Sequence, residues 1–234
     1  MDKDRVWRRI LELIFQSREA ELKDLLKELR TGGPEERFMA SLAEVHSLAV
    51  RHRPTEALRK GERLPPKAPD RWFMARICRS LGIAYMEVGD LSKAEEMFGR
   101  AVEVALDKDK ELIGLFWCYI QSERFDKASE TLSRMDESRE DIAGHRLYCR
   151  AMLEMLRGET TKALAAFRAM PQAEFLSREF AEMRGFLKRT IGDIKGAEED
   201  YLSCMMASIK IGSAYAVFPL AKYYELLLLG DAPP

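Results

Sequence analysis

The sequence predicts an all-α protein in which antiparallel helix pairs repeat as an α-α solenoid. Apolar residues recur at helical spacing through most of the 234 residues, and no stretch of alternating β-branched residues competes with them. In addition, one pattern of small and aromatic residues recurs with a period near 34 residues. A fixed period of this length with two helices per unit is typical of arrays that grow by adding units.

The first third of the chain predicts four helices or fewer. Residues 4–30 carry one apolar stripe, on a long helix or on two helices broken near Gln16. The segment 31–34, TGGP, should end that region, because glycine suits the residue past a helix end and proline suits a first turn. We expect a further helix to about Val50 and a short one over 54–60.

The segment 61–70 is the most loop-like part of the chain, because it is rich in proline and glycine. We expect a linker and the main internal boundary there. Residues 1–60 would then form an N-terminal helical extension, in which Trp7-x2-Ile10-Leu11 and Leu42-Ala43 are compatible with degenerate repeats.

Four repeat units are expected over 71–210. Their ranges are 75–108, 109–142, 143–176 and 177–210. Each unit has an alanine in its second helix, with steps of 34, 35 and 34 residues between Ala94, Ala128, Ala163 and Ala197. A turn precedes each alanine, at Gly89-Asp90, Ser122-Glu123, Gly158-Glu159 and Gly192-Asp193. Residues 211–234 should supply a C-terminal capping helix and tail.

The unit at 75–108 shows why its small residues recur. Gly82 and Ala94 allow the two helices of the unit to approach closely, while Tyr85 and Phe98 fill the space toward the next pair. Asp90 should cap the second helix. Each unit leaves an apolar face that only a neighbouring unit can bury, which is why such units occur in arrays.

This unit resembles the tetratricopeptide repeat family, whose pattern is W-x2-L-G-x2-Y followed by A-x3-F. The matching residues are Leu81, Gly82, Tyr85, Gly89, Ala94, Phe98 and Ala101, with Cys78 in place of the usual tryptophan. The later units match less fully, since Phe116 takes the glycine place and Glu154 and Lys188 take the tyrosine place. The resemblance implies a right-handed superhelix and a role in binding proteins.

The resemblance also implies a partner-binding groove, because the first helix of each unit lines the inner side in this family. The positions carried over are Arg76, Arg79, Ile83, Met86, Lys110, Ile113, Trp117, Ile120, Tyr148, Met152, Met155, Phe186 and Arg189. The centre of this set is apolar and its ends are charged. It suits an amphipathic helix or an extended apolar segment of a protein or peptide, since methionine adapts its shape and tryptophan offers a large contact area.

Within that groove, Trp117 and Phe186 are the expected anchors, and the cationic end at Arg76, Arg79 and Lys110 would select an acidic flank. Some family members hold the acidic C-termini of chaperones with polar clamp residues. Ile83, Gly114 and Met152 stand at those positions here, so we do not expect that activity. The expected function is a protein-binding scaffold or adaptor, or a chaperone-like protein.

Two other functions remain open at the sequence level. Residues 4–30 could fill the groove, within the chain or in a homodimer, and the chain would then be a homo-oligomerisation module with a self-filled groove. The segment 51–67 carries a basic strip that could contact phosphates. No aromatic residue lies within it to stack a base, so a nucleic-acid partner is less favoured.

Nothing in the sequence indicates an enzyme, a metal site or a cofactor. The three histidines, His46, His52 and His145, are scattered, and no phosphate-binding loop or nucleophile elbow occurs. The four cysteines lie in helical patterns without CxxC spacing and should be reduced. The formal net charge of -1, the absence of a run of about 18 apolar residues and the charged first residues predict a cytoplasmic protein without a membrane span.

Overall fold

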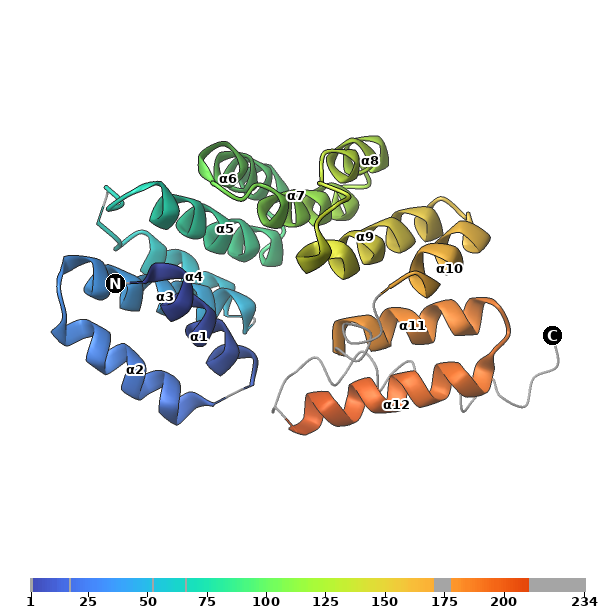
Figure 1. The fold of residues 1–234 in the computed structure, drawn as a ribbon, viewed down its shortest axis with the longest axis horizontal. Coiled ribbons are helices and arrows are strands. Elements are labelled where there is room, and N and C mark those ends of the chain that lie inside the picture. The colour runs from blue at the N-terminus through green and yellow to red at the C-terminus, as the bar shows by residue number, and fades with distance from the viewer. Residues whose placement is uncertain (1, 17, 52, 66, 171–177, 211–234) are drawn as a thin grey trace. The chain divides into compact units, whose positions relative to one another are not determined.

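The protein is all-α over the part of the chain that the structure describes. The computed structural model describes residues 2–16, 18–51, 53–65, 67–170 and 178–210, and within these ranges it has twelve α-helices, one short 3₁₀ helix and no strand (Figure 1). Consecutive helices pair along the chain, as expected for a helix-pair solenoid. The expected fold class is therefore confirmed.

Four helices precede the repeat units, and their ends follow the turn residues. The helices are α1 Lys3–Phe15, α2 Glu19–Thr31, α3 Pro34–Val50 and α4 Pro54–Gly61. The stripe over 4–30 is thus carried by two helices that break after Phe15, and the two later helices begin at proline, as expected. The residues before the repeats form two helix pairs of their own.

The repeat region continues the pairing. Its elements are α5 Arg71–Glu87, α6 Leu91–Val104, α7 Asp109–Gln121, α8 Phe125–Ser133, the 3₁₀ turn η1 Glu140–Ile142, α9 Ala143–Leu156, α10 Thr160–Arg168, α11 Arg178–Thr190 and α12 Ile194–Lys210. The C-terminal cap expected over 211–234 lies outside the described residues.

The chain divides into two compact units, unit 1 from Met1 to Met135 and unit 2 from Asp136 to Pro234. This division differs from the boundary expected at 61–70, because the loop at 62–70 lies inside unit 1. There α3 and α4 pack against α5, and Val45, Ala49, Ala57 and Ala84 share one buried cluster. A proline-rich loop does not separate domains when apolar faces on its two sides are buried against each other.

The aromatic ring of Phe98 joins three helices of unit 1. An added Cβ at Gly82 on α5 would lie 3.0 Å from the Phe98 ring, and one at Gly114 on α7 would lie 2.3 Å from it. Phe98 itself, on α6, is 1% exposed. The close approach expected at Gly82 is therefore present, and Gly114 extends it to the first helix of the next repeat.

The turns between paired helices share one backbone conformation. Gly89, Gly158 and Gly192 have φ of 80°, 79° and 82°, a region that side chains with a Cβ disfavour. Glu123 occupies the equivalent position of the α7–α8 turn with φ 57°. Asp90 accepts a hydrogen bond from the Lys93 backbone N–H at 3.1 Å, so it caps α6 as expected.

A matched pair of glycine substitutions tests the contact at Phe98. Gly114→Ala should lower the free energy of unfolding by about 1–3 kcal/mol, because the added methyl group overlaps a fully buried ring. Gly99→Ala, on α6 with no heavy atom within 4 Å of its added Cβ, should instead raise it by about 0.5–1 kcal/mol. Urea unfolding followed by circular dichroism measures both. Equal effects of the two changes would contradict the packing described.

The α7–α8 turn offers a second test. Glu123→Gly should raise the free energy of unfolding by about 1 kcal/mol, because it removes a side chain from the left-handed region. Glu130→Gly, at an exposed position inside α8, should lower stability by about 1 kcal/mol as the control. Thermal unfolding of the parent and the two variants measures the change in stability. A loss of stability in Glu123→Gly would show that the turn is not strained.

Candidate functional site

The candidate site is the inner face, by which we mean the first-helix positions that the family resemblance assigns to the groove. In unit 1 these positions lie on α5 and α7, and in unit 2 they lie on α9 and α11. The part in unit 1 combines a polar network with an apolar row.

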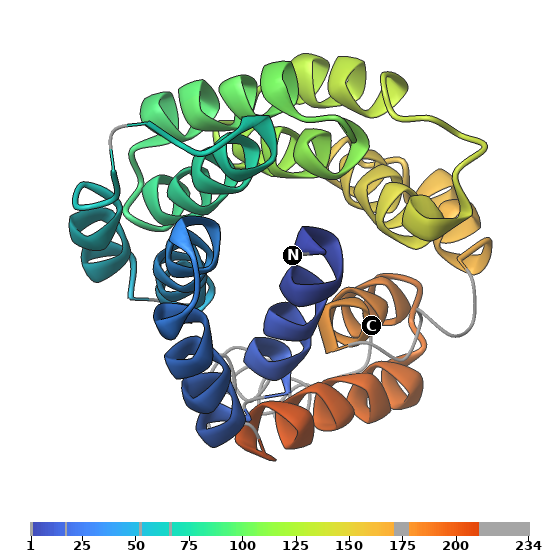
Figure 2. The same cartoon turned by 60° about the vertical axis from the view of Figure 1, so that its left-hand side comes forward.

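The N-terminal helix α1 covers the inner face of α3. Ala57 on α4 corresponds to Ala94 on α6, 37 residues later, so the inner-face positions of α3 are Met39, Leu42, His46 and Ala49. All four are at most 5% exposed. The Trp7 ring of α1 lies 5.3 Å from the His46 ring and 6.0 Å from the Trp72 ring of α5, between centroids. In Figure 2, α1 and α4 lie on opposite sides of α3.

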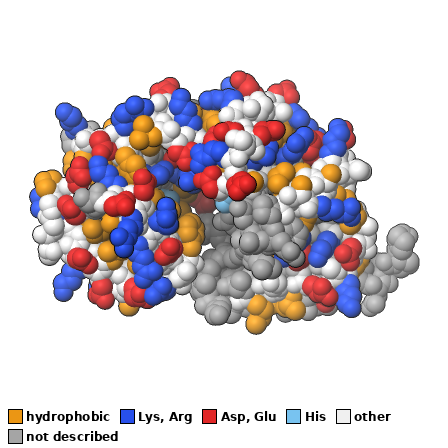
Figure 3. Space-filling model, in the orientation of Figure 1, with side chains coloured by type: hydrophobic (Ala, Val, Ile, Leu, Met, Phe, Trp, Pro, Cys, Tyr) orange, Lys and Arg blue, Asp and Glu red, His pale blue; other side chains and the backbone are white. Residues whose placement is uncertain are grey.

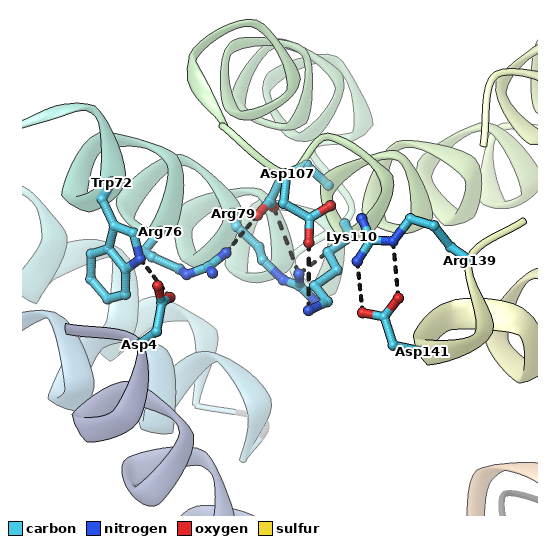
Figure 4. A network of polar contacts seen from close by, with 9 residues as sticks. Asp4, Trp72, Arg76, Arg79, Asp107, Lys110, Arg139 and Asp141 are labelled. Carbon is cyan, nitrogen blue, oxygen red and sulfur yellow. Dashed lines mark hydrogen bonds and ion pairs between the residues drawn. The ribbon is translucent and has the colours of Figure 1, made fainter. Parts of the chain in front are cut away.

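Polar contacts fix the start of α1 against α5. The indole Nε1 of Trp72 donates a hydrogen bond to Asp4 at 2.9 Å, as Figure 4 shows. The Lys3 ammonium pairs with Asp70, the residue that caps α5, and lies 3.4 Å from Glu35 on α3. The helix is therefore held at its first turn by charged groups and along its length by apolar packing.

His46 is a buried, neutral histidine between three helices. The Ser80 hydroxyl donates to the Arg76 carbonyl oxygen at 2.8 Å and lies 3.0 Å from His46 Nδ1. Because the hydroxyl has only one proton, we assign the remaining proton to Nδ1, which donates to Ser80. Burial, and then the positive charges of Arg79 and Arg76, lower the pKa of His46 from 6.5 to about 3.

Two of the expected cationic residues converge on one buried carboxylate. Arg76 donates through Nη1 to Glu111 Oε1 at 2.8 Å, and Arg79 Nη1 lies 3.8 Å from Glu111 Oε2. Glu111 is fully buried, whereas the side chains of Arg76 and Arg79 are 17% and 32% exposed. Burial lowers the pKa of Arg76, while the charge of Glu111 opposes that change. The network is drawn in Figure 4.

The third expected cation, Lys110, is half-buried beside these arginines. Its ammonium lies 3.5 Å from Asp107, and its backbone oxygen accepts a hydrogen bond from Arg79 Nη1 at 3.2 Å. The three cations are therefore brought together, but each already contacts an internal acid or carbonyl. Part of each cation's surface remains exposed.

The apolar part of the inner face in unit 1 adjoins the cation cluster. Its members are all half-buried, and they are Ile83, Met86, Ile113, Trp117 and Ile120. Ile83 and Met86 also pack against Ala94 and Phe98, so both take part in the core. The Trp117 ring meets the Phe116 ring edge to face, with centroids 5.4 Å apart.

Unit 2 holds the remaining predicted residues on two helices. Tyr148, Met152 and Met155 on α9 are half-buried and pack against a cluster that contains Ala151 and Phe167. On α11, Phe186 is 39% exposed and Arg189 is half-buried. The methionines are thus partly structural, and Phe186 offers the most exposed apolar surface of this set.

Sequence reasoning missed four residues that shape the inner face of unit 1. Trp7, His46, Trp72 and Glu111 each contribute to the α1 contact or to the cation network. One signal was available, because Trp72 lies four residues before Arg76 and so falls on the same helix face. Glu111 lies near exposed Lys108 and half-buried Lys110 in the chain, and nothing in the sequence indicated that its carboxylate would be buried.

The basic segment 51–67 is partly neutralised within the fold. Arg51 pairs with Glu19 at 2.7 Å, Arg53 with Glu56 at 2.7 Å and Lys60 with Glu44 at 2.6 Å. On the side shown in Figure 3, positive and negative side chains are interspersed over the described surface. This mixed charge is not the continuous basic strip that phosphate binding favours.

A metal site, a reactive thiol and a membrane-spanning helix each place a different requirement on the described residues. No three His, Cys, Asp or Glu side chains there are placed to hold a metal ion. All four cysteines are buried thiols, and burial raises the pKa of the Cys118 thiol to about 11. Every described helix is too short or too polar to cross a bilayer.

These features define a helix-repeat protein, and comparison with known families names the repeat. Residues 85–152 match the family model of the tetratricopeptide repeat. The resemblance found in the sequence is therefore confirmed, and residues 85–152 have tetratricopeptide repeat sequence. No curated protein sequence matches it.

Solved structures agree on the fold. A tetratricopeptide repeat protein from Parabacteroides merdae is similar over 96% of this chain and 93% of its own, with 14% identity and a TM-score of 0.58. MamA from Desulfovibrio magneticus, residue 41 to its end, is less similar, with 15% identity, coverage of 75% and 96%, and a TM-score of 0.49. At such identities the likeness concerns the fold alone.

The buried histidine predicts how the stability of the protein depends on pH. Because the folded-state pKa of His46 lies near 3, the unfolded chain binds an extra proton below pH 6.5. The free energy of unfolding should therefore fall as pH decreases from 6.5 toward 3, by up to about 1.4 kcal/mol per pH unit.

Urea unfolding between pH 7.5 and 4.5 measures this slope, and His46→Gln is the control that cannot titrate. The slope should be shallower in the variant. Parallel curves for the two proteins would mean that His46 is exposed to protons in the folded state.

Proposed function

We propose that this protein is a non-enzymatic scaffold that binds an apolar or amphipathic segment of a partner protein on its inner face. The tetratricopeptide repeats support the general class, since this fold supplies protein-binding surfaces. The part in unit 1 is where the chemistry is best defined. A chaperone-like role, in which the bound segment is shielded until delivery, is one form of this function.

The observation that carries the proposal is the half-buried apolar row on α5 and α7. Three inner-face positions of α3, Met39, Leu42 and His46, are buried against α1. The equivalent positions of α5 and α7 stay half-buried. These positions include Ile83, Ile113 and Trp117. A half-buried aromatic beside branched aliphatic side chains offers contact area that a partner would bury further.

The way α1 binds indicates the kind of segment that fits. Its apolar side is buried through Trp7, Ile10 and Ile14, while Asp4 contacts Trp72 at the first turn. An amphipathic helix is therefore already accommodated on the inner face of α3. A partner helix with an acidic end would find Arg76 and Arg79 beside the apolar row.

Self-association is the second candidate, and one observation favours it. Three apolar side chains of α12, Ile194, Leu202 and Met206, are 41%, 38% and 58% exposed. Such residues often lie at contacts between protein chains. Light scattering over a range of concentrations would separate the two functions, because only self-association makes the mass depend on concentration.

A pair of tryptophan and leucine variants tests the partner-binding function. We expect Trp117→Glu to abolish retention of a partner from lysate of the source organism, because it places a charge in the apolar row. Leu106→Glu is the matched control, since Leu106 is 81% exposed and lies outside the inner face. Mass spectrometry identifies what the parent and each full-length variant retain.

Removal of α1 is not a suitable test, because Trp7, Ile10, Leu13 and Ile14 are part of the core of unit 1. Far-ultraviolet circular dichroism and thermal unfolding should show that both glutamate variants remain folded. If Trp117→Glu retains the same proteins as Leu106→Glu, the inner face of unit 1 is not the binding surface.

A further inference from the structure

A cavity in unit 1 lies away from the inner-face positions. It has a volume of about 360 Å³ and is lined by the loop that follows α4 and by one side of α5 and α6. Its walls on the helices are Met74, Ile77, Cys78, Leu81, Met97 and Arg100. Gly61, Glu62, Leu64, Pro65 and Ala68 line it from the end of α4 and the loop. All of these residues lie in one compact unit.

Two features of the sequence create this cavity. The helix α4 has 8 residues, whereas its equivalent α6 has 14, so a loop takes the place of further helical turns against α5. Cys78 stands where the family pattern has tryptophan, and its small side chain forms part of the wall. A small residue in place of a large one leaves unfilled volume unless the surrounding structure collapses.

The side chains that α5 contributes to the walls are mostly apolar and adaptable. Met74, Ile77, Leu81 and Leu64 are half-buried, so part of each side chain faces open space. Methionine has an unbranched, polarizable side chain that adjusts to the shape of a ligand. The volume falls at the lower end of the range for small-molecule sites, which is about 300–1,000 Å³.

The rim of the cavity carries unneutralised positive charge. Arg100 is exposed and forms no ion pair with any residue in the described ranges. Arg63 and Lys67, which lie in the loop between lining residues, also lack ion-pair partners among the described residues. Glu62 is the one acidic residue that lines the cavity. Apolar walls with a cationic rim are complementary to a ligand that has an apolar tail and one negative charge.

We propose that this cavity binds a small aliphatic carboxylate, a fatty acid of short to medium chain length. The tail lies against Ile77, Leu81 and Met97, and the carboxylate forms an ion pair with Arg100. Arg63 and Lys67 add favourable charge at the entrance. The site is separate from the inner face, so this proposal does not depend on the proposed function.

The rate at which Cys78 is alkylated measures whether the cavity is occupied by a ligand. Its thiol lines the cavity but is only 2% exposed, and burial raises its pKa. The other three cysteines, Cys118, Cys149 and Cys204, do not line this cavity. A bound aliphatic chain should therefore slow alkylation of Cys78, measured by mass spectrometry of its peptide, and leave the others unchanged.

Calorimetric titration of the full chain with octanoate tests the proposal. We expect saturable binding of one octanoate, with octanol at least fivefold weaker because it lacks the charge. Arg100→Gln should weaken octanoate binding about fivefold and leave octanol unchanged. Arg134→Gln, at an exposed arginine on unit 1 outside the cavity, is the matched control and should bind like the parent.

Filling the cavity provides a second measurement. Cys78→Trp restores the residue of the family pattern and should abolish octanoate binding while the helix content stays unchanged. If that variant does not fold, the comparison of Arg100→Gln with Arg134→Gln still decides the outcome. Equal binding of octanoate by these two arginine variants, or equal binding of octanoate and octanol by the parent, would overturn the proposal.

Discussion

The structure of unit 1 depends on one close contact, the insertion of the Phe98 ring between glycines of two neighbouring helices. Gly82 on α5 lies so near the ring that an added methyl group would be in tight contact with it, and at Gly114 on α7 the methyl group would overlap it. A helix pair alone cannot bury both faces of such a ring. The contact therefore fixes α6 against its partner and against the next pair at the same time, and the inner-face positions of α5 and α7 are set by it.

Within that frame, the inner face of unit 1 combines structural and exposed groups. Fully buried Glu111 holds Arg76 and leaves the guanidinium groups of Arg76 and Arg79 only partly exposed. An uncompensated carboxylate at that depth would be costly, so the arginines stabilise the fold as well as charging the surface. The helix α1 adds a second constraint, because it buries inner-face positions of α3. The half-buried apolar row is therefore confined to α5 and α7.

Several features of the fold could be predicted because they depend on local chemistry. Pro34 and Pro54 mark helix starts, Gly89 marks the turn after α5, and Asp90 caps α6. The break after Phe15 and the short α4 were expected for the same reason. The boundary expected at 61–70 differs from the division after Met135, since loop composition says nothing about whether α3 and α4 bury apolar surface against α5. For the site, the repeat period was enough to predict which residues of α5 and α7 occupy equivalent inner-face positions.

The sequence by itself determined the helix-pair repeat, its period and the residues that occupy equivalent positions, because spacing along one chain fixes which side of a helix each residue occupies. Only the tertiary structure decided which of those positions remain exposed. His46 is buried by Trp7, 39 residues away in the chain, and Glu111 accepts a hydrogen bond from Arg76 of another helix. Burial and pairing of this kind depend on how separate helices pack, which no local pattern records.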